Sequence, residues 1–235
     1  MIKEVLIFGA NSPLGRGVTD VLSKEDYDKI YLFVRDMSRF KTMIPNVEII
    51  QTDDFGNEDS VKEAFHKIYP SKNKLFFMFS AVGGFTGGKS ICETSTGDFD
   101  WMINSNIRAN FLISKYFSML VEESAGGSAC FTSAITGIYP DYHKGVYGLS
   151  KAALIHMVRT LALEGEKINL TANAIAPCVI DTPGNREWMD EESLESALKT
   201  NEIGEVVSNL FKSFRFINNN VIELKKRLSI KGLPF

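Results

Sequence analysis

Short apolar runs alternate with longer amphipathic stretches along the chain, and this alternation constrains the fold more than any other sequence feature. Short apolar runs are typical of buried strands and longer amphipathic stretches of helices, so the pattern predicts βαβ units around a parallel sheet. Strands are expected at 5–8, 30–34, 47–51, 75–79, 129–132, 171–175 and 221–224. Helices are expected at 14–23, 58–68, 98–122, 146–164 and 202–214. The predicted fold class is therefore α/β, with a doubly wound parallel sheet of about seven strands.

Length and charge limit the classes of protein to consider. The chain has 235 residues, and no repeat or linker divides it, so we expect one domain over 1–235. The net charge of −3 gives no reason to expect a nucleic-acid partner or a basic membrane patch. No apolar run approaches the roughly 20 residues that cross a bilayer. The cysteines show no metal-ligand spacing, and their odd number argues against a disulfide framework. We expect a cytoplasmic protein without a metal site.

A glycine pattern follows the first predicted strand and opens the first predicted helix, as Gly9-Ala-Asn-Ser-Pro-Leu-Gly15. Gly9 permits a tight turn, and Gly15 lets the helix pack close to the sheet. The free N–H groups and the positive dipole end of the helix would face a pyrophosphate. Pro13 stands where a glycine is expected and removes one of these donors. The expected cofactor contacts are Gly9, Asn11, Ser12, Leu14 and Gly15.

Residues after the second and third strands bear on which dinucleotide binds. An acid near the end of the second strand is typical of NAD sites, whereas an arginine accommodates the 2′-phosphate of NADP. Here Arg35 comes first and Asp36 second, so we predict NADP, although a solvated charged turn remains an alternative. Asp53 is expected to accept a hydrogen bond from the adenine amine; a role in forming the turn is the alternative.

Tyr147 and Lys151 stand four residues apart in a predicted helix, which places both side chains on one face. A phenol is a poor acid at neutral pH, with an ordinary pKa of about 10. A nearby cation favours the phenolate and lowers that pKa. Such a pair can deliver a proton to a carbonyl oxygen, or remove it in reverse. We expect Tyr147 to be the general acid/base.

These segments together resemble the short-chain dehydrogenase/reductase family, from the glycine loop to at least Arg186. The loop is similar to the family's glycine signature, and Tyr147–Lys151 matches its Tyr-x-x-x-Lys motif. The stretch 173–182 resembles the segment that lines the nicotinamide. The resemblance implies a single-domain Rossmann fold, an NADPH cofactor, a small carbonyl or alcohol substrate and a homodimer or homotetramer. The long helices expected at 98–122 and 146–164 would form the subunit seam, with Leu112, Tyr116, Leu154 and Val158 as candidates, although the spacing of these residues also suits the internal core.

The resemblance also implies roles for individual residues. Asn106 would support a water-linked proton path to Lys151, and Ser133 would hydrogen-bond the substrate carbonyl. Lys151 would also bond the nicotinamide ribose. The remaining expected cofactor contacts are Gly83, Pro177 and Thr182.

Several positions depart from the family pattern. Cys178 replaces a glycine, and Ser80-Ala-Val-Gly83 replaces Asn-Asn-Ala-Gly. Ser133 lies fourteen residues before Tyr147, one residue more than is usual in the family. The usual spacing would place the serine at position 134, which is an alanine in this sequence. We prefer an extra residue in the intervening loop; loss of the serine, with Thr132 or a water in its place, is the alternative. Residues 188–193 are expected to form either a mobile lid or a plain surface helix.

The sequence thus predicts a carbonyl reductase or alcohol dehydrogenase that uses NADPH. The loop 83–88 is similar to that of dihydropteridine reductase-like members, so a pteridine-type reductase is an alternative. A non-catalytic NADP-binding sensor or scaffold is the second alternative. Retention of the tyrosine, lysine and asparagine argues against it, because a sensor needs no proton donor.

Overall fold

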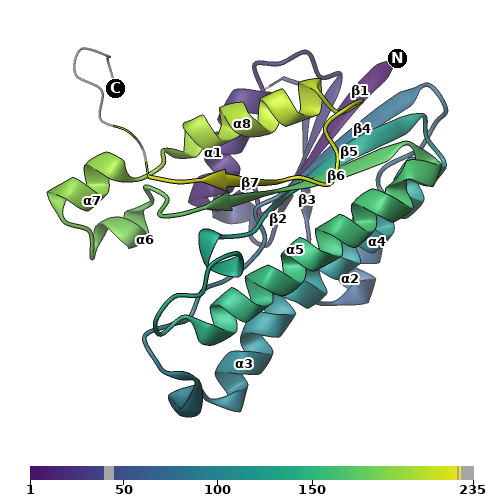
Figure 1. Ribbon diagram of the computed structural model, residues 1–235. Helices are drawn as coiled ribbons and strands as arrows, with labels where there is room; N and C mark the ends of the chain where they lie inside the picture. Colours follow the sequence, from purple (N-terminus) through teal and green to yellow (C-terminus); the bar gives the residue numbers. More distant parts are fainter. Residues whose placement is uncertain (40–44, 227, 229–235) are drawn as a thin grey trace.

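One sheet of seven parallel strands runs through the residues that the structure describes (Figure 1). The computed structural model describes residues 1–39, 45–226 and 228. The strand order is β3-β2-β1-β4-β5-β6-β7. The prediction of a doubly wound α/β fold is confirmed, and each predicted strand is found. The strands are β1 (Ile2–Phe8), β2 (Lys29–Val34), β3 (Val47–Gln51), β4 (Lys74–Ser80), β5 (Gly126–Thr132), β6 (Leu170–Pro177) and β7 (Val221–Leu224).

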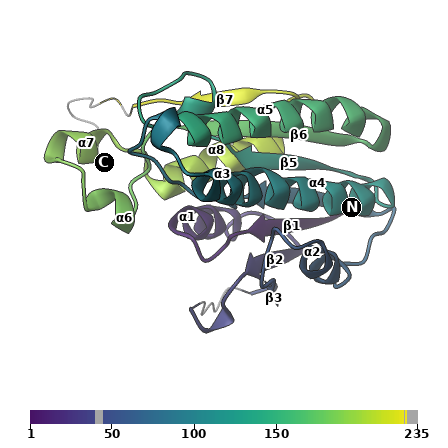
Figure 2. The ribbon, with the colours of Figure 1, turned by 90° about the horizontal axis from the view of Figure 1, so that it is seen from below.

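Helices cover both faces of this sheet (Figure 2). Alternate residues of β1 point to opposite faces, so Val5 and Ile7 join one apolar cluster and Leu6 and Phe8 the other. This double coverage explains why the strands read as continuous apolar runs. One face is covered by α1 (Pro13–Leu22) and α8 (Thr200–Lys212), the other by α2 (Glu58–Phe65), α4 (Ala109–Glu122) and α5 (Gly145–Gly165).

Capping side chains fix where the early helices begin. The Ser12 hydroxyl accepts a hydrogen bond from the backbone N–H of Gly15 at 3.0 Å, and Pro13 occupies the first turn of α1. Asn57 caps α2 in the same way, since its Oδ1 accepts from the N–H of Ser60 at 3.1 Å. The loop between β1 and α1 is therefore short and held at both ends.

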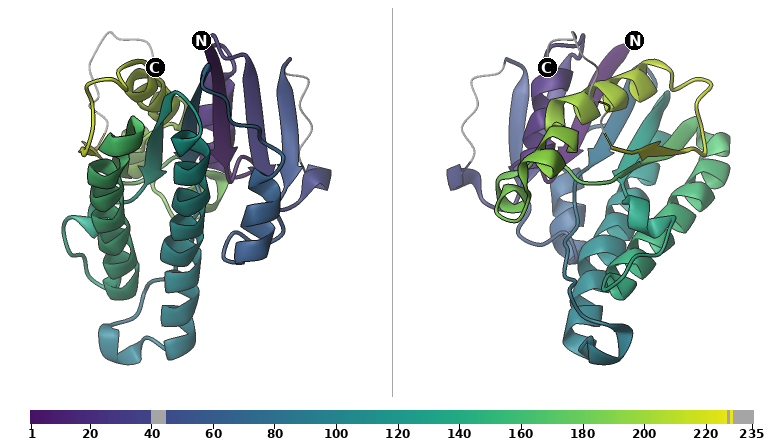
Figure 3. Two further views of the ribbon diagram at one scale, coloured as in Figure 1. Left: turned by 90° about the vertical axis from the view of Figure 1, so that its right-hand side faces the viewer. Right: turned by 60° about the vertical axis from the view of Figure 1, so that its left-hand side comes forward.

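The helix predicted at 98–122 is interrupted. It consists of α3 (Thr96–Ile103), a π-helical turn (Asn104–Arg108) and α4. It begins earlier than predicted because the Ser95 hydroxyl caps it, accepting from the N–H of Asp98 at 3.0 Å. A π turn has bonds of i→i+5 spacing, which apolar periodicity does not reveal. In Figure 3 the part of the chain around α3 projects beyond the end of the sheet opposite the N-terminus.

Two short helices follow β6: α6 (Pro183–Arg186) and α7 (Glu191–Ser196). They lie beyond the end toward which β7 points (Figure 1). Within the part of the chain that the structure describes, no helix is both long and apolar enough to cross a membrane.

The structure supports the internal-core alternative for Leu112, Tyr116, Leu154 and Val158 and not their place in a subunit seam. Leu112, Leu154 and Val158 are buried in the core beneath the sheet, and Tyr116 packs against that core. Helical spacing alone did not distinguish the inner face of each helix from the outer one. The apolar side chains that α4 and α5 expose are instead Phe111, Met119, Leu149 and Leu163.

Candidate active site

A cavity of about 180 Å³ lies at the carboxyl ends of β1, β2 and β4. Because the strand order reverses at β1, connections leave it in opposite directions and open a crevice at this edge. The predicted residues that line the cavity are Gly9, Asn11, Ser12, Arg35 and Gly83. Loops distant in the sequence therefore converge here, as the sequence predicted.

The loop after β1 is shaped to hold a phosphate group close to the backbone. Gly9 has a φ of 72°, which side chains other than glycine rarely adopt. A Cβ on Gly15 would lie 2.2 Å from the carbonyl oxygen of Gly9, so no side chain fits there. Leu14 is buried in the core, so it can meet a ligand through its backbone alone. This geometry fits a dinucleotide pyrophosphate at the N-terminus of α1.

Arg35 follows β2, and two aspartates, Asp53 and Asp54, follow β3. Arg35 is exposed at the end of β2 and lines the cavity. Asp53 does not line it, because its carboxylate turns to Gln51, whose Nε2 donates to it at 2.9 Å. The next residue, Asp54, is the acid among the lining residues. Asp54, and not Asp53, is therefore the aspartate that lines the cavity.

Three further lining residues come from the segment that carries Asn106, although the sequence did not single them out. Trp101 on α3 and Asn104 and Ser105 in the π turn line the cavity. Trp101 lies so close to Gly84 that a Cβ there would be 2.3 Å from its indole. The sequence predicted a regular α-helix through this segment. Such a helix would present other residues to the cavity, so the three residues were not indicated.

Tyr147 and Lys151 lie together on α5, as predicted from their spacing. The Lys151 ammonium is 5.8 Å from the centroid of the Tyr147 ring. It is buried and donates a hydrogen bond to the carbonyl oxygen of Thr132 at 2.9 Å. The edge of the Tyr147 ring meets Phe85, with 4.9 Å between centroids. The phenol ring and the ammonium are thus held by contacts from the loop after β4 and from the end of β5.

Burial governs the protonation of both groups. It raises the pKa of Tyr147 to about 12, because removal from water disfavours the phenolate. It lowers the pKa of Lys151 to about 8, because removal from water disfavours the ammonium. The sequence-based expectation that Lys151 lowers the pKa of Tyr147 is therefore outweighed by burial. At neutral pH the phenol retains its proton.

Asn106 fastens the loop after β4 to the interrupted helix. Its Oδ1 accepts from the N–H of Gly84 at 2.9 Å, and its Nδ2 donates to the Gly84 carbonyl at 3.0 Å. The Nδ2 also donates to the Ser150 hydroxyl at 3.0 Å. A Cβ on Gly83 would lie 2.5 Å from Asn106 Oδ1 and 3.1 Å from Lys151 Nζ. The side chain of Asn106 thus positions the loop beside Lys151.

Ser133 does not present its hydroxyl as expected. The residue is buried, and its hydroxyl donates to the carbonyl oxygen of Lys151 at 3.0 Å. A hydroxyl has a single proton, so this one is committed to the backbone of α5. Thr132 is also committed, donating to the Ser80 carbonyl at 2.8 Å. Ala134, the other position considered, carries no hydroxyl.

A second cavity, of about 470 Å³, lies beyond the ends of β5, β6 and β7. Its walls include Ile135, Tyr139, Cys178 and Trp188, so residues 188–193 border a cavity where a lid or a surface helix was expected. Pro177 ends β6 immediately before this cavity. Thr182 caps α6, its hydroxyl accepting from the N–H of Asn185 at 3.3 Å.

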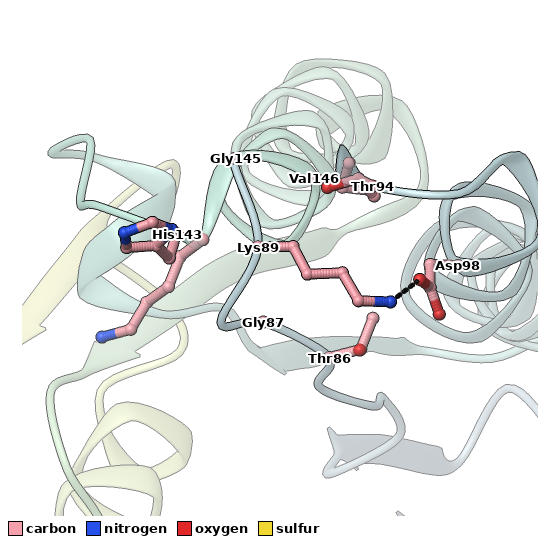
Figure 4. Close-up of a pocket in the computed structure, with 9 residues that line it drawn as sticks. Thr86, Gly87, Lys89, Thr94, Asp98, His143, Gly145 and Val146 are labelled. Carbon is pink, nitrogen blue, oxygen red and sulfur yellow. Dashed lines mark hydrogen bonds and ion pairs between the residues drawn. The ribbon is translucent and has the colours of Figure 1, made fainter. Parts of the chain in front are cut away.

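A smaller hollow separates the loop after β4 from the start of α5 (Figure 4). Its volume of about 10 Å³ has room for one water at most. Lys89 points across it to Asp98 on α3, with 3.0 Å between Nζ and Oδ2. The N–H of Gly88 donates to the His143 carbonyl at 2.9 Å. These contacts tie the loop that carries Gly83 and Phe85 to α3 and to the residues just before α5.

A comparison with models of protein families shows the family of this chain, because one model matches most of its residues. A family model described as short chain dehydrogenase matches residues 3–193. The chain belongs to the short-chain dehydrogenase family. In this short-chain dehydrogenase Tyr147 and Lys151 lie at the geometry described above. No group of three or more His, Cys, Asp or Glu side chains within the described ranges could hold a metal ion.

Relatives of this short-chain dehydrogenase have varied names. A tropinone reductase homolog of Arabidopsis thaliana is 31% identical over 173 residues, 69% of this chain and 56% of that protein. The match thus spans little more than half the length of the plant protein. Dihydropteridine reductase of Dictyostelium discoideum is 25% identical over 207 residues, 87% of this chain and 86% of that protein.

Solved structures share the fold. The structure titled "ElxO with NADP Bound" has a TM-score of 0.84 and 24% sequence identity, covering 95% of this chain and 97% of that one. Aldohexose dehydrogenase of Thermoplasma acidophilum has a TM-score of 0.81 at 22% identity, covering 94% and 92%.

Proposed function

We propose that this short-chain dehydrogenase is an NADPH-dependent carbonyl reductase or alcohol dehydrogenase. The observation that carries the proposal is the buried Lys151 ammonium 5.8 Å from the ring of Tyr147, next to the Gly83 loop. Among the described residues no carboxylate pairs with the buried Lys151. A buried lysine without such a partner is unfavourable for stability, so its presence beside a phenol suits chemistry rather than packing.

The residues divide the reaction between them. NADPH would supply a hydride to the carbonyl carbon, which leaves NADP⁺ and an alcohol. Tyr147 delivers the proton to the carbonyl oxygen, and its raised pKa keeps that proton available at neutral pH. Lys151 stabilises the phenolate that forms, because the two groups are close and shielded from water. Asn106 holds the Gly83–Gly84 backbone against this pair.

A panel of ketones and aldehydes tests this function through the loss of NADPH absorbance. Turnover of at least one carbonyl compound is expected, with the alcohol as product. If the protein binds NADPH tightly but reduces no member of a broad panel, it is instead the sensor or scaffold considered from the sequence.

A pteridine-type reductase is the second candidate, because the match to the Dictyostelium dihydropteridine reductase covers 86% of that protein. The commitment of Ser133 to the Lys151 carbonyl also favours a substrate that needs no serine hydroxyl. Turnover of quinonoid dihydropterin at a rate well above that of simple ketones would select this candidate.

Arg35 is expected to make the protein prefer NADPH over NADH by roughly 10- to 100-fold in Kd, the value of one charge-assisted contact. Solved structures of the same fold are titled as holding NADP or NADPH, which supports the choice. Arg35→Asp should reverse or abolish the preference in calorimetric titrations. Equal affinity of the unaltered protein for both cofactors would contradict it.

Ser133→Ala is expected to leave turnover within about threefold, because the hydroxyl serves the backbone of α5. The free energy of unfolding should fall by about 1 kcal/mol through the lost hydrogen bond. Steady-state kinetics and urea unfolding of the same preparation check both parts. A loss of turnover of roughly 100-fold at unchanged stability would return the carbonyl-binding role to Ser133.

We expect a homodimer or homotetramer with closed symmetry, formed through the exposed apolar side chains of α4 and α5. Met119 and Leu163 are each more than half exposed, at 54% and 61%. Met119→Glu combined with Leu163→Glu should lower the mass found by light scattering to that of one chain. A monomer at micromolar concentration before any substitution would refute the expectation.

A further inference from the structure

The second cavity is lined by apolar side chains and by two lysines. Ile135, Val179 and Trp188 line it, and Trp188 is 63% exposed, so a ligand there would cover a large aromatic surface. The charged residues among its described lining are Lys225 and Lys226, which directly follow β7. No carboxylate belongs to that lining.

Both lysines can accept a new anionic partner. Lys225 lies 3.0 Å from Glu223, and Lys226 lies 3.3 Å from Glu192. These lysine side chains are 68% and 63% exposed, and ion pairs with such exposure contribute little to stability. Glu223 is further occupied by the Tyr139 hydroxyl, which donates to it at 3.1 Å. An anion entering from the cavity would therefore meet ammonium groups.

Part of the cavity lining is linked to the helix that carries Tyr147 and Lys151. Ile135 opens the short turn Ile135–Gly137, which packs on α5. A Cβ on Gly137 would lie 2.8 Å from the carbonyl carbon of Lys151. Cys178 follows Pro177, the end of β6. A molecule filling the cavity would thus contact both the turn that packs against the Lys151 backbone and the two lysines.

We propose that the substrate is a carbonyl compound with an apolar body and a carboxylate at its far end, bound by Lys225 and Lys226. The inference rests on the proposed reductase function. The apolar body covers Trp188, and the carboxylate sets which end of the molecule enters first. Lysine suits this role because its ammonium is a point charge that accepts a carboxylate from several directions.

The kinetic test uses matched aryl ketones that carry a carboxylate or its neutral amide at the end distant from the carbonyl. The unaltered protein is expected to show a kcat/KM at least about tenfold higher for the carboxylate, mainly through KM. The double variant with Lys225→Gln and Lys226→Gln should lose this preference, and its kcat/KM for the amide should equal that of the unaltered protein. Lys212→Gln is the matched control, because Lys212 lies on α8 and forms an ion pair with Glu25 at the surface. This variant should retain the preference for the carboxylate.

Calorimetric titration of the carboxylate and the amide, with and without NADP⁺, separates this inference from the proposed function. Tighter binding of the carboxylate, lost in the double variant, supports the lysine site even if neither ketone is reduced. Equal binding of the two compounds, or a preference that survives in the double variant, overturns it. Reduction of both ketones at equal kcat/KM would overturn the inference while leaving the reductase function intact.

Discussion

Tyr147→Phe is expected to lower kcat by about 10²- to 10⁴-fold, the usual contribution of a positioned proton donor. The phenyl ring keeps the edge contact with Phe85, and Lys151 keeps its bond to the Thr132 carbonyl, so the site should retain its shape. NADPH should bind with unchanged Kd. Single-turnover kinetics and calorimetry with the same preparation measure the two quantities separately.

Tyr116→Phe is the control for removal of a phenolic hydroxyl. Tyr116 donates to Glu58 at 3.1 Å, on the helices away from the cavities, so its loss should leave kcat within about twofold. If Tyr147→Phe kept more than a tenth of the turnover, another group would have to supply the proton and the proposed mechanism would be wrong.

Gly83→Ala is expected to reduce kcat/KM by roughly 100-fold or more, since a shift of about 1 Å at a reaction centre has effects of this size. The added Cβ would lie 2.5 Å from Asn106 Oδ1, closer than atoms approach without displacement. Either Asn106 releases Gly84 or the loop moves away from Lys151. In either case the Gly83–Gly84 backbone no longer lies against Asn106 and Lys151 as it does in the unaltered protein.

Gly97→Ala on α3 is the matched control, because the nearest atom to its added Cβ is the Ser95 hydroxyl oxygen at 3.8 Å. This variant should be as active and as stable as the unaltered protein. Circular dichroism and thermal unfolding of both variants show whether the Gly83 change is local. Full activity of Gly83→Ala would mean that the close approach of loop and helix is not required.

The sheet was predictable because its strands are apolar on both faces and its helices on one. Val5 to Phe8 contribute to both clusters, so that strand reads as an unbroken apolar run. The outer faces of α4 and α5 were not predictable. Leu112 and Phe111 are neighbours of similar character, yet one is buried and the other exposed, and helical phase near the π turn decides which.

Within the site, sequence reasoning succeeded where spacing alone fixes geometry. Tyr147 and Lys151 meet because four residues make about one turn of α5, and Gly9 meets Gly15 because the loop is short. It failed where adjacent residues of equal chemistry compete. Asp53 and Asp54 differ only in the direction that the chain takes after β3, and that direction depends on contacts distant in the sequence.

Ser133 illustrates a different limit. The residue type is right for binding a carbonyl, and the position follows a strand that ends at the site. Its hydroxyl nevertheless lies against α5, where the Lys151 carbonyl accepts its proton. Sequence spacing identifies the segment that reaches a site, whereas hydrogen bonding determines which side chain of the segment is available to a ligand.

The π turn at Asn104–Arg108 affects which sequence changes this protein can tolerate. A chain one residue shorter here could continue as a regular α-helix, with better backbone hydrogen bonding. Removing a residue would turn α3 by about 100° relative to α4 and carry Trp101 and Asn106 away from Gly84. Substitutions in this segment can be compensated one at a time, but a deletion cannot. Insertions and deletions should therefore be rarer in this helix than at its exposed end near Glu122.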